Sequence, residues 1–172
     1  MEFSHTAYLA LGANLGQRLS TLKRAIEAIE ATAGIKVTQV SRLYQTSPVD
    51  SSGPDYINAV IEVRTSLSPM ALLDFCQSIE TSFGRVRPQG VHNAPRTLDI
   101  DILLYDRQHS DDPRLVLPHP RMTQRLFVMM PLRDIAPQWE DEKGKSVGDW
   151  IKEIESIDPS QKIKPVDENC ML

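Results

Sequence analysis

A run of eight residues, Leu98 to Tyr105 (LDIDILLY), has the alternating pattern of a β-strand, yet it carries two aspartates. Aspartate is depleted in strands, so two of them in one strand need a physical reason. Residues two apart in a strand point to the same face, which places the carboxylates of Asp99 and Asp101 about 7 Å apart. The opposite face is apolar and suited to burial: Leu98, Ile100, Ile102 and Leu104. The segment therefore predicts a strand with one buried and one acidic face.

The paired carboxylates indicate a cation site. Two neighbouring carboxylates repel each other, and the repulsion raises the pKa of one of them unless a cation lies nearby. Ligands that are all oxygen favour Mg²⁺ over zinc, and Mg²⁺ commonly binds together with substrate phosphates. Asp99 and Asp101 are therefore candidate magnesium ligands. The alternative is a solvated acidic face, which is less favourable because Asp suits an exposed strand poorly.

Helical and extended patterns alternate along the chain, and two extended segments follow each other on either side of one loop. Extended segments are expected at residues 8–11, 35–44, 56–65, 98–105 and 115–117, and helices over Leu15–Ile29, 69–83, 121–132 and 147–157. Ser68 and Pro69 have the form of an N-cap and first helical residue. Helices would end at Gly34, at Gly84, and at Pro131 with Pro137. This order favours an α+β fold, mainly antiparallel, with helices packed on the sheet. We expect one domain over 1–157 and a frayed polar tail over 158–172.

The composition is that of an ordinary soluble domain. The chain has 172 residues, of which 41% are hydrophobic, and this length suits a single domain. Its net charge of −4 argues against nucleic acid or anionic membrane as a partner. No apolar run approaches the length of a membrane span, and the first residues lack a signal-peptide pattern. Cys76 and Cys170 fit a reduced, cytoplasmic protein.

Arginines cluster on both sides of the acidic strand. They are Arg85, Arg87, Arg96, Arg114, Arg121 and Arg125. A planar guanidinium binds phosphate through two parallel hydrogen bonds, so carboxylates for Mg²⁺ and arginines for phosphate together indicate phosphoryl transfer. The alternative for each arginine is an ordinary surface ion pair. The turn Gly12-Ala13-Asn14-Leu15-Gly16 is neither a P-loop nor a dinucleotide fingerprint.

Three further features are candidates for binding. Gln77 and Glu80 lie three apart on the second expected helix and share a face, which could also be simply solvated. Tyr56 and Asn58 share a strand face and could hold a flat polar ring by stacking and hydrogen bonding, although ordinary strand positions are the alternative. His119 lies between two prolines in extended backbone ahead of two arginines, whereas most lone histidines are structural or exposed.

Taken together, these segments closely resemble the 6-hydroxymethyl-7,8-dihydropterin pyrophosphokinase family of folate biosynthesis, over residues 7 to 137. The most specific block is Pro95-Arg96-Thr97-Leu98-Asp99-Ile100-Asp101. The other blocks follow in the same order as in that family: Gly12 to Gly16, Tyr44 and Thr46, Asp55 to Asn58, Gly84 to Arg87, and Pro118-His119-Pro120 with Arg125. Departures from the family pattern occur at Ser47, Asn93 and Pro120, and none of them removes a candidate metal ligand or arginine.

The resemblance implies a ferredoxin-like α+β fold and transfer of pyrophosphate from ATP to the hydroxymethyl oxygen of the pterin. Asp99 and Asp101 would hold two Mg²⁺ ions, and Arg85 and Arg96 would be the strongest catalytic arginines. The residues around ATP would be Gln77, Glu80, Arg85, Arg87, Arg96, Ile102, Arg114, His119 and Arg125. The pterin pocket would be Thr46, Val49, Tyr56, Asn58 and Phe127. A monomer acting on these small molecules, without a nucleic-acid or membrane partner, is expected.

Two other classes remain open on the residues alone. A two-metal phosphohydrolase or nuclease could use the same carboxylates to activate water, but such sites usually need more carboxylates or histidines than one D-x-D pair. A ferredoxin-like RNA-binding module is the other alternative, but the acidic balance of the chain and the lack of an RNP-type aromatic signature argue against it. Only the family reaction requires a pterin, ATP and Mg²⁺ together.

Overall fold

A computed structural model describes residues 3–14, 18–46, 56–83 and 98–166 of the chain. Its strands are β1 (His5–Ala13), β2 (Ile35–Val40), β3 (Tyr44–Thr46), β4 (Tyr56–Thr65), β5 (Leu98–Tyr105), β6 (Ser110–Asp112), β7 (Leu115–Leu117) and β8 (Ile163–Pro165). Its helices are α1 (Arg18–Glu30), α2 (Pro69–Ser82), α3 (Leu126–Ile135) and α4 (Val147–Ile157), with a 3₁₀ turn, η1, at Met122–Gln124. No helix in these ranges is long and apolar enough to cross a membrane.

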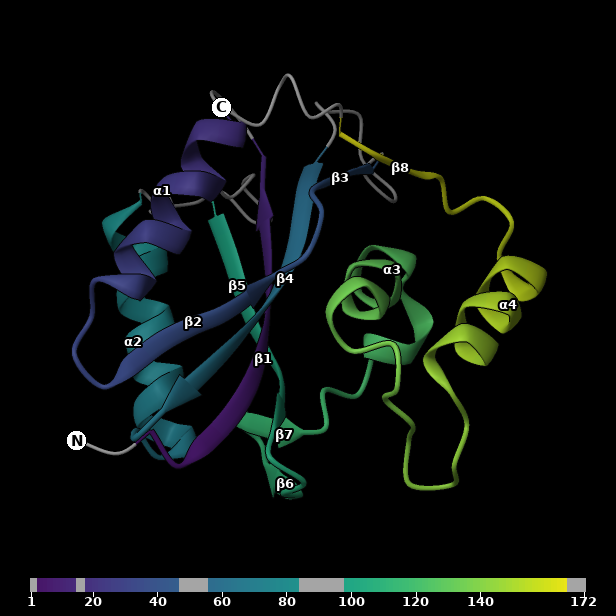
Figure 1. Cartoon of the computed structure of the whole chain (residues 1–172). Coiled ribbons are helices and arrows are strands. Elements are labelled where there is room, and N and C mark those ends of the chain that lie inside the picture. The colour runs from purple at the N-terminus through teal and green to yellow at the C-terminus, as the bar shows by residue number, and fades with distance from the viewer. Residues whose placement is uncertain (1–2, 15–17, 47–55, 84–97, 167–172) are drawn as a thin grey trace.

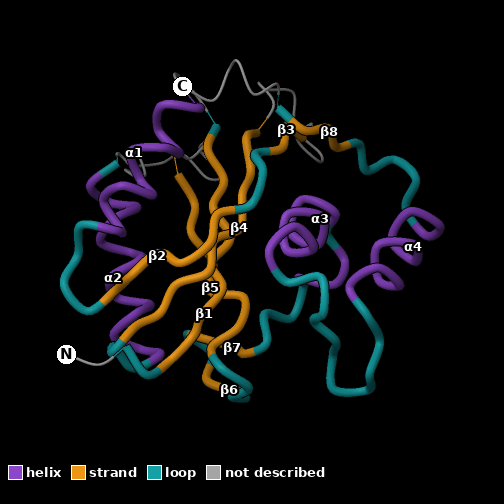
Figure 2. Tube along the Cα trace, in the orientation of Figure 1, coloured by secondary structure: helices purple, strands orange, loops and turns teal. Residues whose placement is uncertain are grey.

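The main sheet is antiparallel and lies between two layers of helices. Its strands run in the order β5-β1-β4-β3-β8, and β2 pairs with the other half of β4. Helices α1 and α2 cover one face, and α3 and α4 lie on the other side (Figures 1 and 2). If β2 and β3 are counted as one broken strand, the elements from β1 to β5 follow the β-α-β-β-α-β order of the ferredoxin-like fold. The α+β prediction is therefore confirmed.

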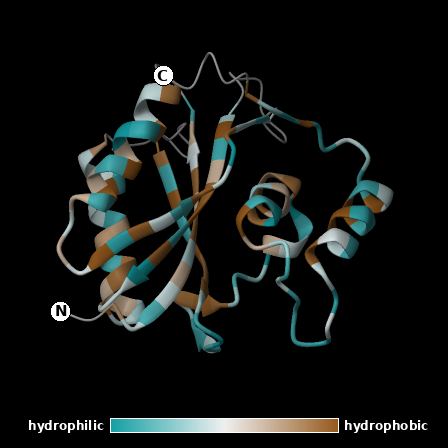
Figure 3. Cartoon of the chain, in the orientation of Figure 1, coloured by the Kyte–Doolittle hydropathy of each residue, from teal (hydrophilic) through white to brown (hydrophobic). Residues whose placement is uncertain are grey.

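Apolar side chains form a cluster on each face of the sheet. One joins the sheet to α1 and α2 through Leu9, Leu11, Leu22, Ile61 and Leu72, among others. The other joins it to α3 and α4 through Val60, Leu103, Met129, Leu132 and Ile151, among others. Hydrophobic stretches accordingly recur along the strands in the middle of the molecule (Figure 3). The second cluster covers only part of its face, which leaves the end of the sheet that carries the acidic residues to polar side chains.

The predicted strand over residues 35–44 is wrong as one continuous element. The regular pairing stops at Ser41. Its N–H still donates to the Val60 carbonyl at 2.9 Å, but the Val60 N–H donates to the Ser41 Oγ at 2.9 Å and not to its backbone carbonyl. Asp134 on α3 holds the resumed strand: its Oδ2 accepts from the Tyr44 hydroxyl at 2.7 Å and from the Arg42 N–H at 3.2 Å. Burial, followed by this hydrogen bond, raises the pKa of Tyr44 to about 12, so the phenol remains a donor at neutral pH.

The predictions for the helices hold at some ends and fail at others. Ser68 is the N-cap of α2, and its Oγ accepts from the Ala71 N–H at 3.2 Å, as the sequence indicates. Pro131 and Pro137 were expected to close a helix over 121–132. Instead α3 begins at Leu126, continues through Pro131 and ends at Ile135, two residues before Pro137. Proline forfeits one backbone hydrogen bond inside a helix, and the burial of Met129, Pro131 and Leu132 against the sheet offsets this loss.

The expected frayed tail at 158–172 is wrong for its first part. Residues 163–165 form β8, which pairs antiparallel with β3, and the Val166 N–H donates to the Leu43 carbonyl at 2.8 Å. The segment lacks an apolar period, but the backbone groups on the outer edge of β3 supply its hydrogen-bond partners. In Figure 1 this strand lies beside β3, far along the chain from it.

Candidate active site

The two aspartates of β5 lie on the face of the sheet that α3 and α4 partly cover. Asp99 is half-buried and Asp101 is exposed, whereas Leu98, Ile100 and Ile102 are buried against the α1 and α2 layer. The predicted alternation is therefore confirmed over these residues. It fails at the end of the strand, where the pairing of β1 and β5 shifts register between Tyr8 and Leu9, and Leu103 and Leu104 both join the second cluster.

A single row across the sheet joins the acidic strand to the residues expected around the pterin. Gly12 on β1 pairs with Asp99 on one side and with Asn58 of β4 on the other. Paired residues of neighbouring antiparallel strands present their side chains on the same face. Gly12 has no side chain, so the row presents the Asn58 amide and the Asp99 carboxylate with only backbone between them.

The side chain of Asn58 is held in a defined orientation. It is buried, and its Nδ2 donates a hydrogen bond to the Thr46 Oγ1 at 2.8 Å. A Cβ added at Gly12 would lie 3.0 Å from the Asn58 Oδ1, which is tighter than ordinary van der Waals contact. Glycine inside a strand is often a sign of such a close approach. The sequence analysis expected Gly12 in a turn after the first strand, whereas β1 continues through it to Ala13, so this close approach was not predicted.

Arg125, His119 and Phe127 come to the same region from the chain before and within α3. Arg125 stands directly before α3, and its guanidinium carbon lies 5.4 Å from the centroid of the Phe127 ring. Burial lowers the pKa of Arg125, while the nearby carboxylates of Asp101 and Asp99 oppose that shift. An arginine remains charged regardless, so a cation faces the acidic pair.

His119 is placed as a neutral imidazole. Its backbone N–H donates to the Leu103 carbonyl of β5 at 2.9 Å, and its Nδ1 accepts from the Arg121 N–H at 3.2 Å. Burial lowers the pKa of His119, with Asp101 opposing and Arg125 adding to the shift. Because Nδ1 is an acceptor, the neutral tautomer carries its proton on Nε2. His119 is then a donor at the edge of the acidic face.

Glu80 has a position that the sequence did not indicate. It is only 4% exposed, although Gln77 on the same helix is exposed. Its Oε2 accepts a hydrogen bond from the backbone N–H of Ile100 at 2.8 Å, between Asp99 and Asp101. In the described sheet β5 is an edge strand, paired only with β1. Glu80 therefore satisfies an outward N–H of the strand that carries both candidate metal ligands.

Glu80→Leu should lower the free energy of unfolding by about 1–3 kcal/mol, because the buried Ile100 N–H loses its acceptor. Glu80→Gln retains a side-chain oxygen and should lose less. Urea unfolding followed by circular dichroism measures both. The matched control is Gln77→Leu, an exposed position on the same helix, where a change within about 0.5 kcal/mol is expected. Equal stability of Glu80→Leu and wild type would show that this hydrogen bond does not anchor β5.

Other predicted site residues do not converge on this face. Arg114 lies just before β7, and its guanidinium is paired with Asp74 of α2 at 2.8 Å between two exposed side chains. The side chain of Ile102 is buried in the cluster with α1 and α2, so it is not available on the acidic face. Four predicted residues lie outside the described residues: Val49, Arg85, Arg87 and Arg96.

The donor set on this face suits a hard cation that brings ligands of its own. Asp99 and Asp101 offer carboxylate oxygens, which Mg²⁺ prefers. Within the described ranges no group of three or more His, Cys, Asp or Glu side chains is arranged to hold a metal ion. Phosphate oxygens and water would then complete the coordination, as is usual for Mg²⁺ bound with a nucleotide.

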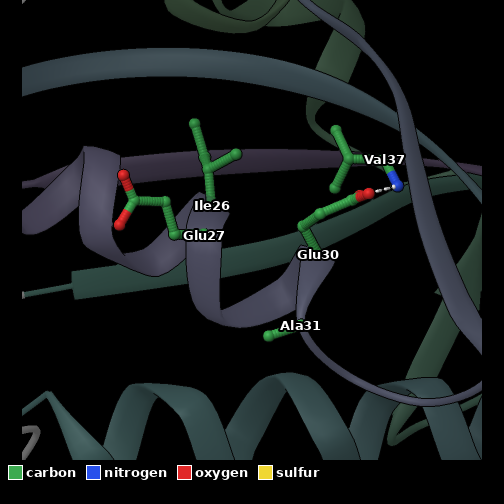
Figure 4. A pocket seen from close by; sticks show the side chains of 5 residues that line it. All are labelled: Ile26, Glu27, Glu30, Ala31 and Val37. Atoms are coloured by element: carbon green, nitrogen blue, oxygen red, sulfur yellow. Dashed lines mark hydrogen bonds between the residues drawn. The ribbon is translucent and has the colours of Figure 1, made fainter.

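A separate pocket lies between α1 and β2. It is lined by Ile26, Glu27, Glu30, Ala31 and Val37, and the Glu30 Oε2 accepts from the Val37 N–H at 2.6 Å (Figure 4). Helix α1 packs on the opposite face of the sheet from Asp99 and Asp101, so this pocket is not part of the acidic site.

Comparison with known proteins shows which family the chain resembles. Residues 8–137 match the family 7,8-dihydro-6-hydroxymethylpterin-pyrophosphokinase (HPPK). The chain is 42% identical over 140 residues to the 2-amino-4-hydroxy-6-hydroxymethyldihydropteridine pyrophosphokinase of Bacillus subtilis (strain 168), covering 81% of this chain and 83% of that protein. It is 41% identical over 155 residues to the protein of the same name from Synechocystis sp., covering 90% and 77%.

Solved structures show the same fold. A structure described as HPPK-DHPS in complex with substrates matches with a TM-score of 0.71 and 14% identity, over 90% of this chain and 44% of that one. Wild-type HPPK-DHPS of Plasmodium falciparum matches with a TM-score of 0.69 and 16% identity, over 88% and 41%. The chain thus spans less than half of these solved chains, and at such identity the likeness concerns the fold alone.

Proposed function

The chain belongs to the 7,8-dihydro-6-hydroxymethylpterin-pyrophosphokinase family, and from this we propose that it transfers pyrophosphate from ATP to the hydroxymethyl group of 6-hydroxymethyl-7,8-dihydropterin. The products are AMP and the pterin diphosphate, a step of folate biosynthesis. The observation that carries the proposal is the sheet row of Asn58, Gly12 and Asp99. It joins a buried amide suited to a polar ring to a carboxylate suited to a metal–nucleotide complex.

In this proposal, Asp99 and Asp101 hold two Mg²⁺ ions with the phosphates of ATP. Bound there, the ions neutralise negative charge on the triphosphate and on the leaving AMP. The two carboxylates fit this role because they share one face of β5. Glu80 keeps the strand between them in place through the Ile100 N–H.

Cationic and donor groups surround the phosphates. Arg125 supplies a positive charge near Asp101 and Asp99, and the Nε2–H of His119 supplies a hydrogen-bond donor. We also assign Arg85, Arg87 and Arg96 to the phosphates, with Arg85 and Arg96 stabilising charge on the transferred group. Gln77 completes the nucleotide-facing set, as the family resemblance suggests. Arg114 would contact the nucleotide only if it left its ion pair with Asp74. Ile102 would do so only if its side chain left the apolar cluster with α1 and α2.

The pterin lies between polar and aromatic walls in this proposal. Asn58 and Thr46 contribute hydrogen-bonding groups that are already linked to each other. Tyr56, paired with Thr46 across β3 and β4, and Phe127 on α3 contribute aromatic surface. Val49 is assigned to the same pocket by the family resemblance. Stacking and amide hydrogen bonds are what a flat, polar ring requires.

The transfer is a single displacement of AMP at the β-phosphorus of ATP. The hydroxymethyl oxygen forms a bond to the β-phosphorus, the bond from that phosphorus to the oxygen bridging to the α-phosphate breaks, and AMP leaves with the electron pair. The hydroxyl proton is released.

We further propose that the protein acts as a monomer in the cytoplasm.

Incubation of the protein with ATP, Mg²⁺ and 6-hydroxymethyl-7,8-dihydropterin should produce AMP and a pterin diphosphate in equal amounts. Ion-exchange chromatography separates the nucleotides and pterins. A reaction without pterin serves as the control and should leave ATP intact. ADP with a pterin monophosphate would indicate γ-phosphoryl transfer instead. AMP formed equally fast without pterin would indicate a phosphohydrolase.

A further inference from the structure

The side chain of Gln161, from a distant part of the chain, bonds to the backbone on both sides of Arg125; this pair of contacts is called the bracket. Its Oε1 accepts a hydrogen bond from the backbone N–H of Leu126 at 2.9 Å, and its Nε2 donates to the backbone carbonyl of Gln124 at 3.0 Å. Both bonds are to main-chain groups, one on each side of Arg125. A single amide therefore fixes the backbone of the residue between them. Gln161 also lies beyond residues 8–137, the part matched by the family.

This contact replaces a cap that α3 does not supply for itself. The N-cap position is Arg125, whose side chain makes no capping hydrogen bond. The first N–H groups of a helix have no partner within it, so the one at Leu126 depends on Gln161. Helix α3 begins directly after Arg125 and carries Phe127 as its second residue. Any shift of this first turn would move the guanidinium and the aromatic ring together.

Gln161 is itself held in place from both directions. Its Nε2 also lies 3.3 Å from the Asp158 Oδ2, at the end of α4. Two residues further on, β8 begins, and its Ile163 pairs with Thr46 of β3 and packs on the cluster beneath α3. One short segment therefore contacts both the strand that carries Thr46 and the turn that carries Arg125 and Phe127.

We infer that Gln161 is a positioning residue for the active site and that it acts through the main chain around Arg125 and Phe127. The segment from Gln161 to β8 would then connect the two walls of the proposed pterin pocket. The assignment of Arg125 and Phe127 to the site rests on the proposed function. The geometry of the bracket does not, because it involves only Gln161 and the backbone of Gln124 and Leu126.

The test is Gln161→Met, which keeps the length of the side chain and removes its hydrogen bonds to Leu126, Gln124 and Asp158. The matched control is Lys162→Met at the next, exposed position. We expect kcat/KM for the pterin to fall about tenfold or more in Gln161→Met and to stay unchanged in Lys162→Met, since small displacements of positioning groups are costly to rate. Gln161→Glu keeps an acceptor for the Leu126 N–H but turns its second carboxylate oxygen toward the Gln124 carbonyl and the Asp158 carboxylate, so it should lose about as much as Gln161→Met. All assays are run at a temperature where circular dichroism shows each variant folded.

Hydrogen exchange at the Leu126 amide provides a readout that does not depend on catalysis. Exchange should be faster in Gln161→Met than in wild type and unchanged in Lys162→Met. Unchanged exchange would overturn the bracket, and faster exchange with unaltered kcat/KM would reduce Gln161 to a purely structural role and overturn the inference. If the wild type makes no pterin diphosphate at all, the proposed function fails, while the exchange result still decides whether the bracket exists.

Discussion

Replacement of Asp99 or Asp101 with asparagine is expected to reduce turnover by at least about a hundredfold, because charge neutralisation is the main source of rate at a phosphoryl-transfer site. Asparagine keeps the size of the side chain but removes the negative charge that would hold Mg²⁺. Neither carboxylate belongs to an apolar cluster: Asp99 is half-buried and Asp101 is exposed on the sheet. The fold should therefore survive either substitution, so that the loss is one of chemistry.

The experiment compares kcat at saturating ATP and pterin over a titration of Mg²⁺, with circular dichroism as the measure of folding. Asp112→Asn is the matched control, because it makes the same change at an exposed position of another strand, β6. It should behave as wild type. Turnover near the wild-type value in both Asp99→Asn and Asp101→Asn at saturating Mg²⁺ would rule out the acidic pair as the metal site.

The parts of the fold that could be predicted are those decided by local chemistry. Ser68 and Pro69 start α2 because a side-chain acceptor and a residue without an N–H suit the first turn of a helix. The alternation of Leu98, Asp99 and Ile100 decides which face of β5 is buried, because successive side chains in a strand point to opposite faces. Both features depend on residues within a few positions of each other.

The parts that could not be predicted depend on partners far away in the chain. Glu80 was grouped with Gln77, although its spacing of four from Cys76 places it on the buried face of α2. The spacing does not show why a carboxylate is buried there. The reason is the edge strand β5, whose Ile100 N–H needs an acceptor. Similarly, Pro131 lies within α3 because the sheet beneath it is apolar, and β8 forms because the edge of β3 has backbone groups to pair with.

The candidate site shows the same division. The acid pair could be inferred from β5 alone, because both ligands are on one short segment. The proximity of Asn58 to Asp99 could not, because it depends on how β4, β1 and β5 align, and Gly12 is the residue that links them. Gln161 carries no motif, and its contacts on either side of Arg125 are with the backbone of Gln124 and Leu126, which leaves no trace in the sequence of these partners.

Asn58→Ala should weaken pterin binding by about 1–3 kcal/mol, the cost of leaving buried polar groups of the ring without partners. ATP binding should change little, because Asn58 lies on β4 and Asp99 lies two strands away on β5. Calorimetric titration measures the two ligands separately, with a non-hydrolysable ATP analogue and Mg²⁺ for the nucleotide. Equal losses for both ligands would indicate general misfolding, and unchanged pterin binding would remove Asn58 from the pocket.

Gly12→Ala tests the same amide without deleting it. The new Cβ would lie 3.0 Å from the Asn58 Oδ1, so the amide must shift by a few tenths of an ångström or the strands must separate. Because the Nδ2 of that amide is already committed to Thr46 at 2.8 Å, the shift would disturb both hydrogen-bonding groups of the pocket. Pterin affinity should therefore fall in Gly12→Ala, though by less than in Asn58→Ala.

Gly148→Ala on α4 is the matched control, since a Cβ there approaches only the Ser146 Oγ, at 4.0 Å. If Gly12→Ala binds the pterin as tightly as Gly148→Ala, the close approach of Gly12 and Asn58 has no role in shaping the pocket.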